Sequence, residues 1–168
     1  MKFLPFVVLS AGMALLPGCT LQPAVTDAPQ LDMSFLVEPG QLLPLSRVND
    51  ITGEEVALNT PGRKKLVILF ATWCSDSQRA MKALHQSPLI RDESLDIVAI
   101  AREQESSELA SWAAENDIKT TLVADTDRSI YRQFARAGIP RFIMVDEQNR
   151  IVDAVLAEGE KQLEHIHW

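Results

Sequence analysis

The chain has 168 residues, of which 46% are hydrophobic and 23% charged, and this size fits one globular domain with a modest extension. The formal net charge is −7, and Lys and Arg form no cluster of the kind that phosphate binding needs. We therefore expect no nucleic-acid partner. The sequence also contains no repeat, no low-complexity tract and no long block of charge.

The N-terminal residues have the pattern of an export signal. Lys2 is the only charge before an apolar run from Phe3 to Leu16, and small residues precede Cys19. The run is too short to span a bilayer comfortably, which favours a secretory signal peptide over residues 1–18. No later segment is apolar for long enough to cross a membrane, so any membrane attachment would be through an anchor.

The signal ends in Leu16-Pro17-Gly18-Cys19, which resembles the bacterial lipobox, in which the cysteine is lipidated and becomes the first mature residue. Thr20 is not the aspartate that typically retains lipoproteins in the inner membrane. We therefore expect a bacterial envelope protein that faces the periplasm and is anchored in the outer membrane rather than the inner. The alternative is an ordinary signal peptide cleaved nearby, which would leave Cys19 as a free or disulfide-forming thiol.

The mature chain is predicted to consist of a tether and one domain. Residues 19–33 contain prolines and little periodicity, as expected of a tether, and the regular pattern of a domain occupies 34–168. If Cys19 carries lipid, Cys74 is the only thiol of this domain. An internal disulfide is then excluded.

Hydrophobic periodicity predicts strands that alternate with helices. A Thr52-Gly53 turn indicates an early hairpin, and an i, i+3, i+4 stripe of Leu109, Trp112 and Ala113 indicates a helix. Thr126 is a plausible N-cap of another helix. This order predicts an α/β fold with a central mixed sheet flanked by helices. The predicted strands are 64–71, 95–101, 120–125, 140–146 and 150–157, and the predicted helices follow Cys74 or occupy 106–118, 126–138 and part of 158–168.

Cys74 stands where a buried strand gives way to a helix. A thiol at a helix N-terminus lies near unpaired backbone N–H groups and the positive end of the helix dipole, which favour the nucleophilic thiolate. Ser77, three residues later, can donate a hydrogen bond to that thiolate but cannot attack a mixed disulfide. Asp76 acts in the opposite direction because its carboxylate disfavours a second negative charge nearby. The sequence does not decide which effect is larger.

Two separated motifs carry a resemblance to a known family. "FATWC" at the end of a strand and "AGIPRFIMVDEQNRIV" further on closely resemble the thioredoxin-like superfamily, and within it the membrane-anchored TlpA/ResA type of redoxin. The likeness covers roughly residues 42–163. It implies that Pro140 is cis and faces Cys74, that Ile139 and Pro140 hold a substrate strand, and that Trp73 flanks the thiol. Arg141 would either place positive charge near Cys74 or an acidic substrate, or be solvated.

Four positions depart from the two-thiol pattern of that family. Ser77 replaces the second cysteine, Ala80 an acidic residue, Lys82 a helix-kinking proline and Ile68 a buried Asp or Asn. These changes fit a C-x-x-S site that no longer runs a two-thiol cycle. Peroxiredoxin chemistry is not favoured, because it expects a threonine where Ala71 stands.

The leading hypothesis is an exported, lipid-anchored protein that exchanges thiols and disulfides through Cys74 alone, as a monothiol reductase or isomerase or in de-glutathionylation. Envelope proteins with cysteines or disulfides, glutathione or a partner thiol would complete the reaction. No cofactor and no metal is expected. The rival hypothesis is a redoxin scaffold that has lost its chemistry and binds a peptide or protein. A sulfenic acid sensor is a third possibility.

Overall fold

The structure is a computed structural model that describes residues 32–168. The predicted signal peptide over 1–18, the predicted lipidation site at Cys19 and all but the end of the tether predicted over 19–33 lie outside the described residues. Within the described part, no helix is long and apolar enough to cross a membrane.

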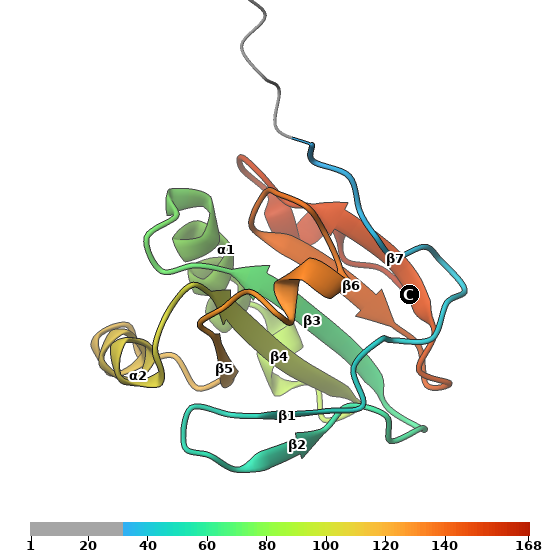
Figure 1. Cartoon of the computed structure of the whole chain (residues 1–168), viewed down its shortest axis with the longest axis horizontal. Coiled ribbons are helices and arrows are strands. Elements are labelled where there is room, and N and C mark those ends of the chain that lie inside the picture. The colour runs from blue at the N-terminus through green and yellow to red at the C-terminus, as the bar shows by residue number, and fades with distance from the viewer. Residues whose placement is uncertain (1–31) are drawn as a thin grey trace, which may run out of the picture. The chain divides into compact units, whose positions relative to one another are not determined.

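The described chain forms a five-stranded mixed sheet with the order β5-β4-β3-β6-β7 and a separate antiparallel pair, β1-β2 (Figure 1). β3, β4 and β5 run parallel, whereas β6 and β7 are antiparallel to their neighbours. The predicted α/β architecture, including the early hairpin, is thus confirmed. The strands are β1 Arg47–Asn49, β2 Glu55–Ala57, β3 Lys64–Phe70, β4 Leu95–Arg102, β5 Thr121–Asp125, β6 Arg141–Val145 and β7 Ile151–Leu156. The helices are α1 Ser75–Gln86 and α2 Ser106–Glu115, with short 3-10 turns η1 Pro88–Arg91, η2 Tyr131–Gln133 and η3 Gln162–His165.

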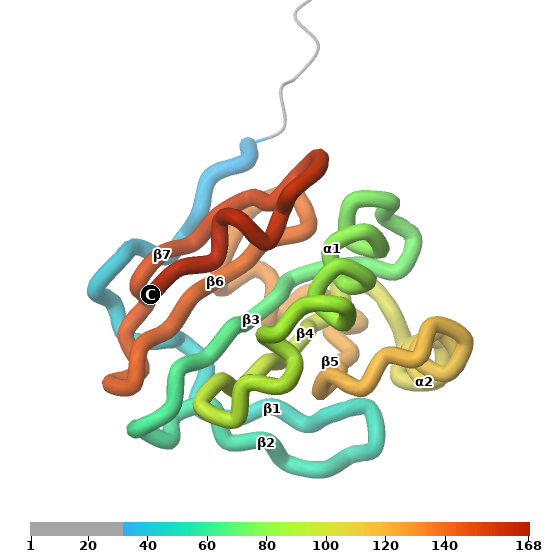
Figure 2. Tube along the Cα trace, turned by 180° about the vertical axis from the view of Figure 1, so that it is seen from behind, coloured from blue at the N-terminus to red at the C-terminus, as the bar shows by residue number. Residues whose placement is uncertain are grey.

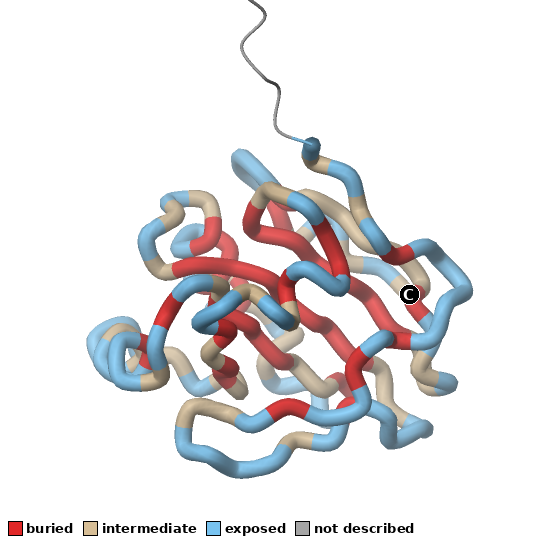
Figure 3. The backbone as a smooth tube through the Cα atoms, in the orientation of Figure 1, coloured by how far each residue is buried: buried red, intermediate tan, exposed pale blue. Residues whose placement is uncertain are grey.

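β3 lies at the centre of the sheet and separates two hydrophobic clusters. Val67 and Leu69 belong to one cluster, whereas Leu66, Ile68 and Phe70 belong to the other, because successive side chains of a strand point to opposite faces. The N-terminal segment, the β1-β2 hairpin and η2 cover the first face, and α1, α2 and the C-terminal segment cover the second. Figure 2 shows α1 and the C-terminal segment on the second face, and Figure 3 shows the buried central strands between the layers.

The segment predicted as a helix over 126–138 is mostly irregular, and only the three residues of η2 form a 3-10 turn. The buried carboxylate of Asp125 accepts hydrogen bonds from the backbone N–H groups of Ile130 (3.0 Å) and Tyr131 (2.7 Å). Arg128 has a φ of 63°, which a right-handed helix cannot contain. Thr126 does not cap a helix, since its hydroxyl donates to the Gln104 carbonyl at 3.3 Å. The periodicity of this segment therefore predicts the wrong structure, because the Asp125 side chain binds backbone N–H groups that a helix would use.

The terminal helix predicted within 158–168 is reduced to η3. The side-chain amide of Gln162 donates to the carbonyls of Ala157 (2.6 Å) and Asp76 (2.9 Å), which fastens this turn to the start of α1. α2 ends at Glu115, slightly earlier than predicted, and Asp117 follows with a left-handed φ of 51°.

Lys65 is a buried cation within β3. Its side chain is 0% exposed, and its ammonium donates to the carbonyls of Thr60 (2.8 Å) and Arg63 (3.0 Å) and to the Asn149 side chain (2.7 Å). Burial holds the pKa of Lys65 below its ordinary value, since removal from water disfavours the charged form. The lysine thereby ties the loop before β3 to the β6-β7 turn.

We expect Lys65→Met to lower the free energy of unfolding by about 1–3 kcal/mol, because the three acceptors lose a charged donor. Urea unfolding of the variant would measure the change. Lys82→Met is the matched control, since Lys82 is exposed on α1. A variant as stable as the original chain would show that the desolvation of the ammonium outweighs its three bonds.

Candidate active site

Cys74 is the N-cap residue of α1, directly beyond the carboxyl end of β3. Its backbone N–H donates to the Ala71 carbonyl at 3.2 Å, and its carbonyl accepts the first helical bond from Gln78 at 3.0 Å. The thiol is half-buried and free. The N–H groups of the first helical turn have no partner within a helix, so the sulfur stands at the positive end of α1, as predicted.

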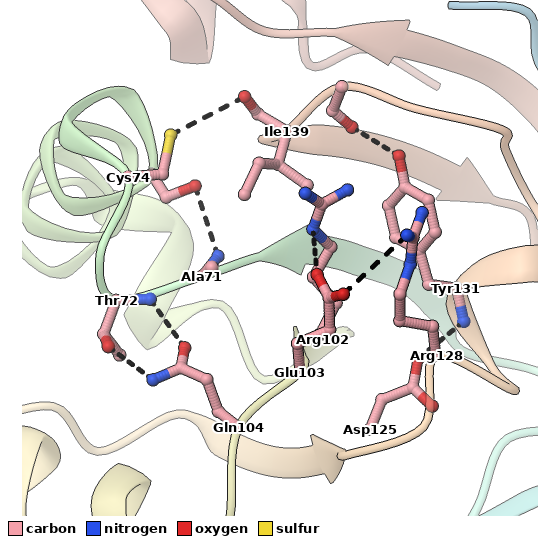
Figure 4. A network of polar contacts seen from close by, with 12 residues as sticks. Ala71, Thr72, Cys74, Arg102, Glu103, Gln104, Asp125, Arg128, Tyr131 and Ile139 are labelled. Carbon is pink, nitrogen blue, oxygen red and sulfur yellow. Dashed lines mark hydrogen bonds and ion pairs between the residues drawn. The ribbon is translucent and has the colours of Figure 1, made fainter.

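The Ile139–Pro140 peptide bond is cis, as the resemblance implied. The Cys74 thiol donates a long hydrogen bond to the Ile139 carbonyl, with 3.8 Å between Sγ and O (Figure 4). Within residues 32–168, the backbone N–H of Ile139 donates to no acceptor. The residue before Pro140 therefore lies against the sulfur and keeps a backbone donor for another chain.

Ser77 takes a different position from the one predicted for it. The residue is fully buried, and its hydroxyl oxygen accepts a hydrogen bond from the Ala71 N–H at 3.3 Å. Among the described residues, no hydrogen bond joins Ser77 to the Cys74 sulfur. Ser77 lies on the inner face of α1 with Ala80 and Met81, because the first turn of this helix already packs on the sheet.

Asp76, whose charge opposes a thiolate, is paired within its own helix. Arg79 forms an ion pair with its carboxylate and also donates to the Gly159 carbonyl at 2.7 Å. The negative charge that faces the start of α1 is therefore partly offset. This pairing reduces the effect of Asp76 that the sequence left open.

Gln104 fixes the loop that carries the thiol, and sequence reasoning missed it. Its side-chain oxygen accepts from the Thr72 N–H at 2.7 Å, and its side-chain nitrogen donates to the Thr72 hydroxyl at 2.5 Å (Figure 4). The residue is buried. A usable signal existed, because a polar residue just past a predicted parallel strand lies at the same sheet edge as the end of β3.

An aromatic and cationic stack lies beside Trp73, which is 57% exposed. The guanidinium carbon of Arg102 is 5.3 Å from the centroid of the Trp73 ring and 5.1 Å from that of Tyr131. Arg128 lies 5.2 Å from the same Tyr131 ring. The Tyr131 hydroxyl donates to the Gly138 carbonyl at 2.7 Å, so the stack is tied to the loop that leads to Pro140.

Arg141 is not solvated, and its full burial keeps its guanidinium from contact with an acidic substrate. The side chain is fully buried and stacks on the Phe35 ring at 4.0 Å. Its guanidinium donates to the carbonyls of Gly138 (3.1 Å), Met33 (2.6 Å) and Ala137. The residue therefore joins the loop before β6 to the N-terminal segment.

A cavity of about 670 Å³ lies between α1 and α2 and reaches Ser75 without including Cys74 in its lining. Its walls are polar and cationic on the α1 side. The half-buried Cys74 itself lies between the exposed Trp73 and the buried Ile139. Within residues 32–168, no group of three or more His, Cys, Asp or Glu side chains is arranged to hold a metal ion.

We expect Gln104→Ala to loosen the thiol loop, because the Thr72 amide loses its acceptor in a buried setting, at a cost of about 1–3 kcal/mol. Hydrogen exchange of the peptide over 70–74 should become faster, as measured by mass spectrometry. Gln86→Ala, an exposed change on α1, should leave this exchange as it is. Unchanged exchange in the Gln104 variant would show that the loop is held by other contacts.

Comparison with solved structures identifies the fold as thioredoxin-like, as predicted. A candidate protein disulfide isomerase from Bacteroides thetaiotaomicron matches with a TM-score of 0.72 and 19% identity, over 79% of this chain and 87% of that one. A secreted disulfide oxidoreductase of Mycobacterium tuberculosis matches with a TM-score of 0.61 and 16% identity, over 70% and 89%. A peroxiredoxin-like protein from Aquifex aeolicus matches with a TM-score of 0.62 and 9% identity, over 74% and 80%. At such identities the likeness concerns the fold alone.

The sequence itself gives a family. No curated protein matches the chain. Residues 39–154, which are more than half of the chain and include both Cys74 and Pro140, match the profile of the AhpC/TSA family. The chain therefore belongs to the AhpC/TSA family.

Proposed function

We propose that the protein is an exported, lipid-anchored redoxin of the TlpA/ResA type that exchanges thiols and disulfides through Cys74 alone. One observation carries this proposal. The single described thiol stands at a helix start against the residue before a cis proline, while the serine in place of a second thiol is buried and bound to Ala71. Such a site has a nucleophile and a substrate surface but no internal resolving group.

The reaction begins when the Cys74 thiolate attacks one sulfur of a substrate disulfide. A new S–S bond forms to Cys74, the original S–S bond breaks, and the other sulfur leaves with the bonding electrons as a thiolate. A second thiolate, from glutathione, the substrate or a partner protein, then attacks the substrate sulfur and releases Cys74. Disulfide bonding is passed between external sulfurs, so isomerisation and de-glutathionylation suit the site better than net oxidation.

The substrate would lie as an extended segment across the surface between Trp73 and Pro140. The N–H of Ile139, which meets no acceptor within residues 32–168, would supply a backbone donor for such a segment, as in strand addition. The exposed Trp73 ring supplies apolar contact area next to the sulfur. These two features also support the rival function, a binding module without chemistry, which the following experiment separates from exchange.

We expect glutathione disulfide to convert the protein, in a Cys19→Ser background, into a lasting mixed disulfide at Cys74, because no internal thiol resolves it. Intact-mass spectrometry would detect the adduct. Ser77→Cys should convert the adduct into an internal disulfide with release of glutathione, since a C-x-x-C pair can close. Ser77→Ala is the matched control and should keep the adduct.

Two outcomes would contradict the proposal. If the Cys74 thiol forms no adduct with glutathione disulfide, or if Cys74→Ser leaves the behaviour towards disulfide substrates unchanged, the binding module becomes the better explanation. In the exchange model, adducts with cysteine-containing envelope proteins also accumulate on Cys74, and a gel without reducing agent would resolve them.

The proposed anchor is tested separately. In a bacterial host, Cys19→Ser should abolish the incorporation of labelled palmitate and move the protein from the membrane fraction to the soluble fraction. Membrane retention of this variant would exclude lipid at Cys19 as the anchor. Separation of inner and outer membranes on a sucrose gradient would test the expected place in the outer membrane.

A further inference from the structure

Arg102 lies at the edge of the thiol site, and the N–H donors of its guanidinium group, called the fork below, have no acceptor in the described part of the chain. Within residues 32–168, none of its guanidinium nitrogens donates a hydrogen bond, and its buried Nε has no hydrogen-bond acceptor. Its nearest charged contact is on the Nε side, where Glu103 lies at 3.4 Å. The N–H groups of the two terminal nitrogens therefore remain without acceptors in this part of the chain, while only 16% of the side-chain surface is exposed.

The register of the sheet places Arg102 next to the start of the loop that carries Cys74. β3 and β4 pair in parallel with Phe70 opposite Ala101, so Arg102 leaves β4 where Ala71 leaves β3. Its guanidinium then stacks on Trp73, the residue directly before the thiol. Figure 4 shows its head group extending toward the same end of the sheet as Cys74 and Ile139.

The surrounding carboxylates do not neutralise the fork. Glu103 is shared between two cations, since it also lies 3.8 Å from Arg128. Asp125, which pairs with Arg102 through the backbone of β5, directs its carboxylate to the amides of Ile130 and Tyr131. The Glu103 carboxylate is thus shared between the guanidinium groups of Arg102 and Arg128.

We propose that Arg102 binds a carboxylate of the substrate whose disulfide Cys74 attacks, an inference that rests on the proposed exchange function. A guanidinium fork donates two parallel hydrogen bonds to a carboxylate, and this geometry is more specific than a point charge. The Trp73 and Tyr131 rings hold the fork in place before the substrate arrives, which lowers the entropic cost of binding. The carboxylate belongs either to glutathione or to an acidic residue beside a substrate cysteine.

The test compares the rate constants of Cys74 with an anionic and a neutral disulfide. Glutathione disulfide is the anionic probe and bis(2-hydroxyethyl) disulfide the neutral one. The readout is the rate constant with glutathione disulfide divided by the rate constant with the neutral disulfide. Arg102→Gln should lower this ratio about tenfold, as expected when a charge-assisted hydrogen bond is lost. Arg102→Lys should recover only part of it, because lysine keeps the charge but not the fork.

Arg132→Gln is the matched control. It removes the same charge from an exposed residue of η2 and should leave the ratio unchanged. A second test uses the unaltered chain, so its result does not depend on whether the variants fold correctly. Esterification of the glutathione carboxylates should lower the rate with the original chain and have no such effect in the Arg102→Gln variant.

Peptide disulfides with Glu or Gln next to the cysteine distinguish the two sources of the carboxylate. A preference for Glu that disappears in Arg102→Gln assigns the site to acidic polypeptides, whereas an effect confined to glutathione disulfide assigns it to glutathione. Equal ratios in the original chain and the Arg102→Gln variant would overturn the inference while leaving the exchange function intact. No reaction of Cys74 with the neutral disulfide would instead overturn the exchange function itself.

Discussion

The parallel pairing of β3 with β4 is the constraint on which the site depends. Their common direction brings the ends of both strands to one edge of the sheet, where the loop that carries Cys74 meets Arg102 at the end of β4 and Gln104 just beyond it. β6, antiparallel to β3, begins at the same edge and supplies Pro140. Three segments far apart in the sequence therefore meet around one sulfur, because the carboxyl ends of parallel strands are where such folds place their sites.

Buried polar side chains then fix the irregular loops around the sulfur. Asp125, Gln104 and Arg141 each bind backbone groups that belong to no α-helix or strand, and each is buried. A buried backbone group without a partner costs about as much as a lost hydrogen bond. These three side chains thus allow the loops near Cys74 to be ordered without the hydrogen bonds of an α-helix or a strand.

The inward position of Ser77 explains how a redoxin site can retain its nucleophile without a second thiol. Because Ser77 accepts a bond from the Ala71 amide, it contributes to the junction of β3 and α1. The Ser77 hydroxyl thereby holds the start of α1, at which Cys74 lies against the residue before the cis proline. The proposed chemistry therefore depends on an external thiol. Substrate recognition then decides which disulfide reacts with Cys74.

Much of the fold could be read from local patterns. The alternation of buried strands and helices and the Thr52-Gly53 turn correspond to the observed elements. Such features depend on hydrophobic periodicity and turn chemistry, which a short window contains. The expected helix over 126–138 failed because Asp125 binds the amides that a helix would use, and periodicity does not register such a competitor.

The amino-acid sequence by itself determined the order of the elements and the thiol at the start of α1. Only the tertiary structure decided the surroundings of that thiol. It turned Ser77 inward, buried Arg141 beneath Phe35 and set Arg102 against Trp73. The physical reason is that these contacts join residues distant in the chain, and sheet register and burial, rather than local propensity, choose which side chains meet there.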